Sequence, residues 1–249
     1  MQKIIVILVN ALLFFACSKN TNTTEVLPLP TGSVAGSVTL NNGTGGVANP
    51  SGAINPAGVL ISIDGTTFSA TTDSNGRYLI ANIPQGAYDI TFSKIGYETF
   101  KLIDATVLAG TTPAEEETVD LFAPCVNAVT TLAVQNYILS GKIIPSFLPN
   151  SQQNIAIYYS SSNAVSSSNY NFVQFWGQTN DSTFSYEIGG LYSMYSSGST
   201  VYIVAYACYG LNFSPANNNS SSYTSPATGK AIFSGLSATP SNVVSVTLP

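Results

Sequence analysis

A nine-residue run in the second half of the chain concentrates side chains that could bind a sugar. Residues 170–178 are Tyr-Asn-Phe-Val-Gln-Phe-Trp-Gly-Gln and include the only tryptophan. Alternate side chains of a β-strand share a face, and here that face would carry Tyr170, Phe172, Gln174, Trp176 and Gln178. Aromatic rings flanked by amides suit a carbohydrate-binding platform, because rings stack on the C–H faces of a sugar and amides bond its hydroxyls. The alternative, which the usual burial of aromatic side chains favours, is that Phe172 and Trp176 lie in a sandwich core.

The acidic residues do not combine into a metal or catalytic site. The start of a calcium-binding loop is resembled by Asp73, Asn75 and Gly76. Such a loop requires a carboxylate at its twelfth position, which here is Pro84. A tight turn explains the same residues, since Asp hydrogen-bonds its own backbone and Asn and Gly accept positive φ. The three consecutive glutamates at 115–117 would point to alternating faces of a strand, and we interpret them as a solvated loop. We therefore expect no bound metal and no other cofactor.

The absence of histidine excludes several classes of enzyme. Without His there is no Ser-His-Asp triad, no Cys-His pair and no His-ligated zinc or iron. A glycosidase working with carboxylates alone would depend on Asp181 and Glu187, the only acidic residues of 124–249. No other acidic side chain is close in sequence to tune that pair, so we expect a protein without catalytic activity. The net charge of −5, with seven basic residues, argues against nucleic acid as a partner.

The start of the chain resembles a bacterial lipoprotein signal. Lys3 precedes an apolar stretch at residues 4–15, and a small residue and Cys17 follow it. The resemblance implies that Cys17 is lipidated and begins the mature chain, and that residues 17–32 form a flexible tether. Ser18, in place of the Asp that retains lipoproteins at the inner membrane, implies the outer membrane. The apolar stretch is too short for a transmembrane helix, while an ordinary cleaved signal with an incidental cysteine stays open.

Two cysteines, Cys125 and Cys208, remain once Cys17 is assigned to the signal. In an exported protein such a pair can form a disulfide. In the chain-entropy model a bond closing a loop of this length would contribute about 4 kcal/mol. Two buried thiols are the alternative, because the sequence does not tell whether the two side chains face each other.

The composition indicates an all-β chain that can bury cores. Only 8% of the residues are charged, against about a quarter in typical soluble domains. Because 45% are hydrophobic and 11% aromatic, the chain also differs from disordered sequences. Runs rich in Val, Ile, Thr, Tyr and Phe are separated by Gly, Asn and Pro, which is the pattern of short strands and turns.

Residues 33–122 predict one β-sandwich of about seven short strands. The expected strands are 33–40, 59–64, 66–72, 77–83, 87–94, 100–108 and 118–122. Four motifs in this region resemble the carboxypeptidase-regulatory-like domain: Gly58-Val-Leu-Ile-Ser-Ile-Asp64-Gly65, Thr72-Asp-Ser-Asn-Gly-Arg-Tyr78, Ile83-Pro-Gln-Gly-Ala-Tyr88 and Ile95-Gly-Tyr-Glu-Thr99. The resemblance implies a transthyretin-like sandwich, a fold grouped with carbohydrate-binding-like folds, with residues 41–56 as an insertion. Since the zinc peptidase of the family name needs histidine ligands, the resemblance implies spacing, presentation or weak binding instead of catalysis.

Residues 123–249 predict a second β-sandwich, which resembles no specific family. Its expected strands are 154–160, 170–178, 183–188, 199–209, 231–233 and 242–248. The segment 126–144 fits either a strand or a short helix. Only four of the residues from 124 onward are charged: Lys142, Asp181, Glu187 and Lys230.

The sequence thus predicts two tandem β-sandwiches behind a signal peptide at residues 1–16 and the tether at 17–32. The predicted function is that of a non-catalytic outer-membrane lipoprotein, on the periplasmic or extracellular face, that binds or presents a ligand. Polysaccharide is the ligand hypothesis. The alternative is a structural or adhesive cell-surface protein that contacts another envelope protein. The predicted partners are the membrane, through the lipid anchor, and either a polysaccharide or such a protein.

Overall fold

The structure, a computed structural model, describes residues 29–41, 54–110, 117–125, 128–144, 152–179, 183–209 and 222–249. Within these ranges the chain forms sixteen β-strands and one short 3₁₀ helix, which confirms the all-β prediction. Cys17 with the signal-like segment, two of the three consecutive glutamates, Asp181 and most of the insertion at 41–56 lie outside the described residues. No helix within the described ranges is long and apolar enough to span a membrane.

The first half of the chain forms two sheets that pack on one core. One sheet has the order β4-β1-β7 and the other β3-β2-β5-β6. The bounds are β1 Thr31–Asn41, β2 Leu60–Ile63, β3 Ser69–Thr71, β4 Arg77–Pro84, β5 Gly86–Ser93, β6 Phe100–Val107 and β7 Glu117–Phe122. Buried side chains of both sheets, such as Val38 of β1 and Phe92 of β5, belong to a single cluster. We call this unit the first sandwich.

The turn after β3 explains the residues that resembled a calcium loop. The Oδ1 atom of Asp73 accepts hydrogen bonds from the backbone N–H groups of Asn75 at 2.8 Å and Arg77 at 2.9 Å. Gly76 has φ +79°, and a Cβ there would lie 2.2 Å from the carbonyl oxygen of Val38. Only glycine can adopt this φ without strain and also fit so close to the Val38 carbonyl. The tight-turn interpretation is confirmed.

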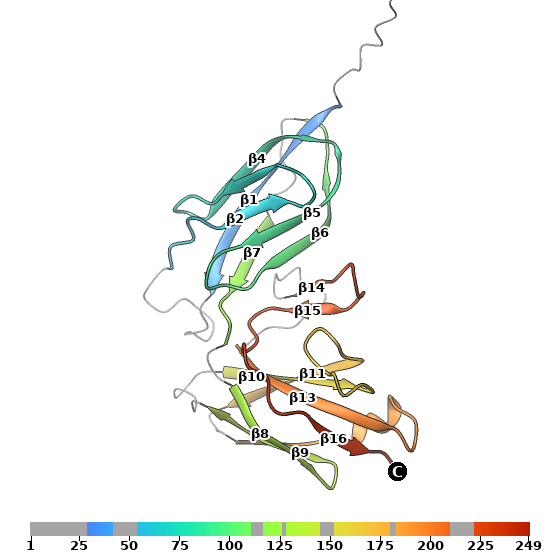
Figure 1. Cartoon of the computed structure of the whole chain (residues 1–249). Coiled ribbons are helices and arrows are strands. Elements are labelled where there is room, and N and C mark those ends of the chain that lie inside the picture. The colour runs from blue at the N-terminus through green and yellow to red at the C-terminus, as the bar shows by residue number, and fades with distance from the viewer. Residues whose placement is uncertain are drawn as a thin grey trace, which may run out of the picture.

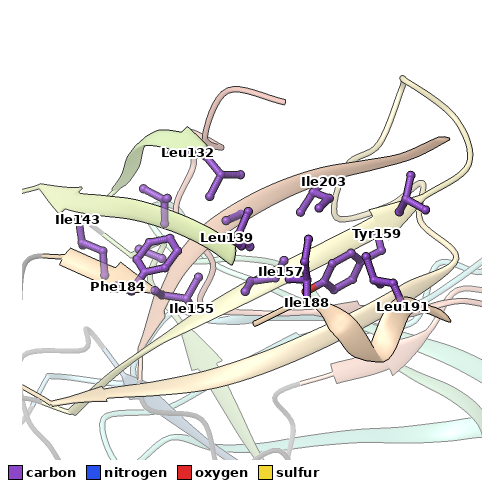
Figure 2. Close-up of a cluster of buried hydrophobic side chains, with 14 of the residues drawn as sticks. Leu132, Leu139, Ile143, Ile155, Ile157, Tyr159, Phe184, Ile188, Leu191 and Ile203 are labelled. Atoms are coloured by element: carbon purple, nitrogen blue, oxygen red, sulfur yellow. The ribbon is translucent and has the colours of Figure 1, made fainter. Parts of the chain in front are cut away.

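The second half forms another pair of sheets, with the orders β11-β10-β13-β16 and β12-β9-β8. The bounds are β8 Ala128–Gln135, β9 Ile138–Ile144, β10 Gln152–Ser160, β11 Phe172–Thr179, β12 Thr183–Glu187, β13 Thr200–Tyr209 and β16 Val244–Thr247. The segment 126–144, which the sequence left open between strand and helix, therefore contains two strands. Figure 2 shows the core between the sheets, where Leu139 of β9 and Phe184 of β12 lie against Ile155 of β10. We call this unit the second sandwich.

A hairpin lies between the two sandwiches (Figure 1). It consists of β14 (Ser222–Thr224) and β15 (Ala231–Phe233). Tyr223 of β14 meets Phe100 of the first sandwich edge to face, with ring centroids 6.1 Å apart. Phe233 of β15 meets Phe175 of the second sandwich at 4.9 Å. The hairpin therefore contacts an aromatic side chain of each unit.

The two remaining cysteines are buried but no disulfide joins them. The segment at Leu236 and Ser237 runs between them, because Leu236 bridges Cys208 and Ser237 bridges Cys125. Two strand spacings amount to about 10 Å, more than the roughly 7 Å that a disulfide spans between Cα atoms. Cys125 also packs in the core of the second sandwich. Cys208 of β13 packs instead on the outer face of the β11-β10-β13-β16 sheet, in a buried cluster that we call the outer cluster. Its buried members are Phe122, Ala156, Tyr158, Val165, Tyr170, Val204, Tyr206, Cys208 and Leu236. In the structure the two cysteines are therefore two buried thiols, the second of the alternatives that the sequence left open.

Candidate functional site

The five side chains expected on one face of residues 170–178 do not form one platform. Strand β11 begins at Phe172, so the strand alternation does not extend back to Tyr170. Tyr170 is buried in the outer cluster, where its hydroxyl donates to the carbonyl oxygen of Ala231 at 2.8 Å. The ammonium group of Lys230 lies 5.3 Å from the centroid of its ring. The side chain of Gln178 lies outside the described part of the structure.

The other three predicted residues do share a side of β11, and that side faces the core of the second sandwich. Phe172 and Trp176 are half-buried against this core. The Trp176 ring stacks on Tyr186 of β12, with centroids 4.5 Å apart and planes at 19°. Tyr159 donates its hydroxyl to Oε1 of Gln174 at 3.4 Å. The Trp176 ring thus spans from β11 to β12, the edge strands of the two sheets.

A cavity of about 470 Å³ opens beside the start of β11. Five side chains from three separate segments line it: Ser161, Asn171, Phe172, Met194 and Tyr195. We call it the β11 pocket. Of the predicted residues only Phe172 contributes to its wall. Trp176 is four residues further along the strand, or about 13 Å.

Local hydrogen bonds fix the polar wall of the β11 pocket. The Oδ1 atom of Asn171 accepts from the backbone N–H of Ser161 at 2.8 Å and from its hydroxyl at 3.3 Å. These bonds join the residue after β10 to the residue before β11. They place an amide and a hydroxyl next to the Phe172 ring, which itself stacks on Tyr159 at 5.9 Å.

The opposite wall comes from the 3₁₀ helix η1 (Gly189–Ser193) and the residues that follow it. Leu191 of η1 is buried beside Ile188 and Tyr159, as Figure 2 shows, and anchors the helix to the core. Tyr195 then reaches the pocket, and its backbone N–H donates to the carbonyl oxygen of Leu191 at 3.0 Å. The segment carries no strand or helix periodicity, which explains why sequence patterns missed Met194 and Tyr195.

The hydroxyl of Tyr195 is buried and has no hydrogen-bond partner among the described residues. Burial raises the pKa of this hydroxyl above its usual value, so it stays protonated and can donate. An unpaired buried hydroxyl costs free energy that a bound acceptor would recover. The residues that line the pocket thus supply an aromatic ring, an amide and a serine hydroxyl, and they include a tyrosine whose own hydroxyl is buried in the free protein.

The residues that line the β11 pocket carry no formal charge. Its lining residues contain no carboxylate, amine, imidazole or thiol that could transfer a proton or attack a substrate. Glu187, one member of the glycosidase pair considered above, is exposed on β12. Within the described ranges no three His, Cys, Asp or Glu side chains are grouped to hold a metal ion.

Comparison with protein families confirms the resemblance in the first sandwich. Residues 42–121 match the family model of the carboxypeptidase regulatory-like domain. The match covers the region of the four sequence motifs and leaves the second sandwich unassigned. A search of curated proteins found no match to the chain.

Several solved structures are similar to parts of the chain. A cohesin–X-dockerin complex from Acetivibrio cellulolyticus contains a chain 26% identical over 37% of this chain, with a TM-score of 0.31. The match covers 58% of that chain. A proposed carbohydrate binding protein from Bacteroides uniformis is 14% identical, covers 88% of this chain and 100% of its own, and has a TM-score of 0.31. A DUF3823 family protein from Parabacteroides merdae is 15% identical over 72% of this chain and 91% of its own, with a TM-score of 0.28.

Proposed function

We propose that this protein is a non-catalytic, lipid-anchored component of the bacterial outer membrane that binds a carbohydrate in the β11 pocket. The first sandwich acts as a spacer between the anchor at Cys17 and the binding unit. The observation that carries the proposal is the pocket itself, where the Phe172 ring lies beside the amide of Asn171 and the hydroxyl of Ser161.

Each wall of the pocket suits one side of a sugar. An aromatic ring contacts the apolar C–H face of a pyranose, while hydroxyl and amide groups bond its rim. Ligand sites generally combine a mostly apolar lining with a few placed polar groups. The buried Tyr195 hydroxyl has no partner among the described residues, so a ligand that turns this side chain toward the pocket would satisfy it. That gain exists only in the complex, so it contributes directly to affinity.

The test of this proposal removes one hydroxyl. The mature chain from residue 17, with Cys17→Ser to keep it free of lipid, is titrated calorimetrically with mannan, xylan, hydroxyethyl cellulose and dextran. We expect saturable binding of at least one of them, and a loss of about tenfold in affinity in Tyr195→Phe, corresponding to one hydrogen bond of about 1.4 kcal/mol. Because the lost hydroxyl is buried and has no partner among the described residues, the folding stability of the variant should equal or exceed that of the wild type.

Tyr202→Phe is the matched control. It also removes one tyrosine hydroxyl, but Tyr202 packs in the outer cluster, on the face of the sheet away from the pocket. Its affinity for the same glycan should equal that of the wild type. If no glycan binds and the chain self-associates instead, the adhesive alternative replaces carbohydrate binding.

The anchor has a separate test in cells. Wild-type protein should incorporate labelled palmitate and fractionate with the outer membrane. Cys17→Ser should lose the label and move to the soluble fraction. Equal labelling and equal fractionation of both proteins would contradict lipidation at Cys17 without affecting the pocket.

A further inference from the structure

A second aromatic feature lies at the end of the second sandwich. The two-residue turn between β8 and β9 consists of Asn136 and Tyr137, with φ of 50° and 60°. A turn with two positive φ values favours Asn followed by Gly. Tyr137 takes the position of that glycine, and a bulky side chain with positive φ is a true outlier. Such outliers concentrate at functional sites, where the side chain has a use that offsets the strain.

Tyr137 lies next to a second tyrosine ring and to exposed apolar side chains. Its ring lies 5.5 Å from that of Tyr192 on η1. Its carbonyl oxygen accepts from the N–H of Ile188 at 2.8 Å, which holds the turn against the start of η1. Tyr192 is 46% exposed. Ile138, which follows Tyr137, is 45% exposed, and Met194, two residues after Tyr192, is 49% exposed. We call these four residues the tip patch.

The tip patch is continuous with the β11 pocket. Met194 belongs to both, since it also lines the pocket. Tyr192 is two residues from Met194, so their Cα atoms are at most about 7 Å apart. The β8–β9 turn lies at the end of the second sandwich that points away from the first sandwich (Figure 1). A ligand that leaves the pocket toward this end would therefore pass over Tyr192 and Tyr137.

The charge of this region narrows the class of ligand. From residue 128 onward, the described ranges contain only three charged side chains: Lys142, Glu187 and Lys230. Lys142 lies on β9 opposite Thr183, at the far end from the turn, and Lys230 packs on Tyr170. Among the charged side chains in the described part of this unit, Glu187 is the one on a strand next to the tip patch, where it pairs with Ile138. A surface of rings and neutral polar groups complements an uncharged partner.

The geometry points to an extended site, in which the β11 pocket holds one end of a neutral oligosaccharide and the tip patch stacks on its following sugar units. This inference rests on the proposed function of the pocket and adds the length and charge class of its ligand. Tyr137 itself is half-buried against the core of the second sandwich, and its hydroxyl donates to the carbonyl oxygen of Thr247 at 3.4 Å. In this site the exposed ring of Tyr192, supported by the Tyr137 ring beside it, serves as the platform that the sequence led us to expect at Trp176.

The test compares short and long ligands. Wild-type protein is titrated with cellobiose and cellohexaose, mannobiose and mannohexaose, and xylobiose and xylohexaose. We expect one hexaose to bind at least tenfold more tightly than its own disaccharide. Tyr192→Ala should reduce hexaose affinity to the level of the disaccharide and leave disaccharide affinity unchanged. Ile95→Ala, which truncates a fully exposed apolar residue of the first sandwich, is the control and should change neither.

A second variant separates binding from folding. Tyr137→Gly places the favoured residue in the turn, which offsets the loss of the Tyr137 packing on the core and of its bond to Thr247. Its unfolding midpoint in urea should therefore stay close to that of the wild type while hexaose affinity falls severalfold. Equal affinities for disaccharide and hexaose, or full hexaose affinity in Tyr192→Ala, would overturn the extended site and leave the pocket in place. Absence of binding by every sugar of the series, or an unchanged affinity in Tyr195→Phe, would overturn the pocket and the extended site together.

Discussion

One tight turn of the second sandwich differs from those of the first. In the first sandwich, the turns that follow β2, β3 and β5 place glycine at positive φ, in Gly65, Gly76 and Gly96. In the second sandwich, Gly198 follows the same pattern, but the β8–β9 turn places Asn136 and Tyr137 in this backbone region. Glycine adopts positive φ without steric cost, whereas tyrosine does not. Among these turns, the departure from local preference is therefore confined to the β8–β9 turn.

The two units also differ in their buried polar atoms that lack a hydrogen-bond partner. Three buried side-chain polar atoms lack a hydrogen-bond partner among the described residues, namely Tyr158 Oη, Trp176 Nε1 and Tyr195 Oη. All three belong to the second sandwich. Native proteins satisfy nearly all such atoms, and each exception requires an explanation. Among the described residues, the buried polar side-chain atoms without a partner therefore lie in the unit that carries the pocket.

The strongest expected effect tests how strictly the first sandwich depends on its glycines. Gly76→Ala combines a positive φ with a Cβ 2.2 Å from the carbonyl oxygen of Val38. We expect it to lower the free energy of unfolding by about 3 kcal/mol, from backbone strain and overpacking together. Urea denaturation followed by far-UV circular dichroism measures this change.

Gly65→Ala is the matched control for that substitution. Gly65 has φ +73°, but no atom lies within 4 Å of a Cβ at this position. Only the strain term applies, so we expect a loss of about 1 kcal/mol. Equal losses at the two positions would show that steric contact with β1 is not what requires glycine at residue 76.

The sequence also predicts the first sandwich better than the pocket of the second. Residues such as Asp73 and Gly76 act through their own backbone, so the turns and the order of strands in the first sandwich follow from local patterns. The β11 pocket instead depends on contacts between distant segments. Asn171 bonds Ser161 across the loop that joins β10 to β11, and Tyr195 arrives from a 3₁₀ segment without periodicity. Alternation correctly put Phe172 and Trp176 on one side, but it could not show that Tyr170 lies before the strand.

The join between the two units has its own titratable group. Glu98 of the first sandwich accepts a hydrogen bond from the backbone N–H of Gly235, which follows the β14–β15 hairpin, at 2.5 Å. Burial raises the pKa of this carboxyl from 4.5 to about 7, against the opposing effect of the Gly235 hydrogen bond. The folded protein therefore binds this proton more tightly than the unfolded chain does. The resulting stabilisation is complete below pH 4.5 and is lost as the pH rises through about 7.

Glu98→Gln should remove that part of the pH dependence. The amide oxygen still accepts from Gly235, but no charge forms, so the difference in unfolding free energy between variant and wild type should grow by on the order of 2 kcal/mol from pH 4 to pH 8, allowing for partial exposure. Glu187→Gln, at an exposed glutamate of β12, is the control and should follow the wild-type profile. Parallel profiles of wild type and Glu98→Gln would mean that the join between the sandwiches does not titrate in this range.

The smallest expected effect asks whether the unpaired hydroxyls of the second sandwich serve stability at all. The Tyr158 side chain is fully buried and its hydroxyl has no partner, whereas Tyr170, whose ring lies 5.0 Å away, donates to Ala231. Removing an unsatisfied buried group relieves its desolvation cost, so Tyr158→Phe should raise the free energy of unfolding by about 1 kcal/mol, and Tyr170→Phe should lower it by a similar amount. Urea denaturation of both variants at pH 7 measures the two changes. Destabilisation of both by the same amount would place a hydrogen-bond partner next to Tyr158, and Tyr195 would then be the one buried tyrosine hydroxyl without a partner among the described residues.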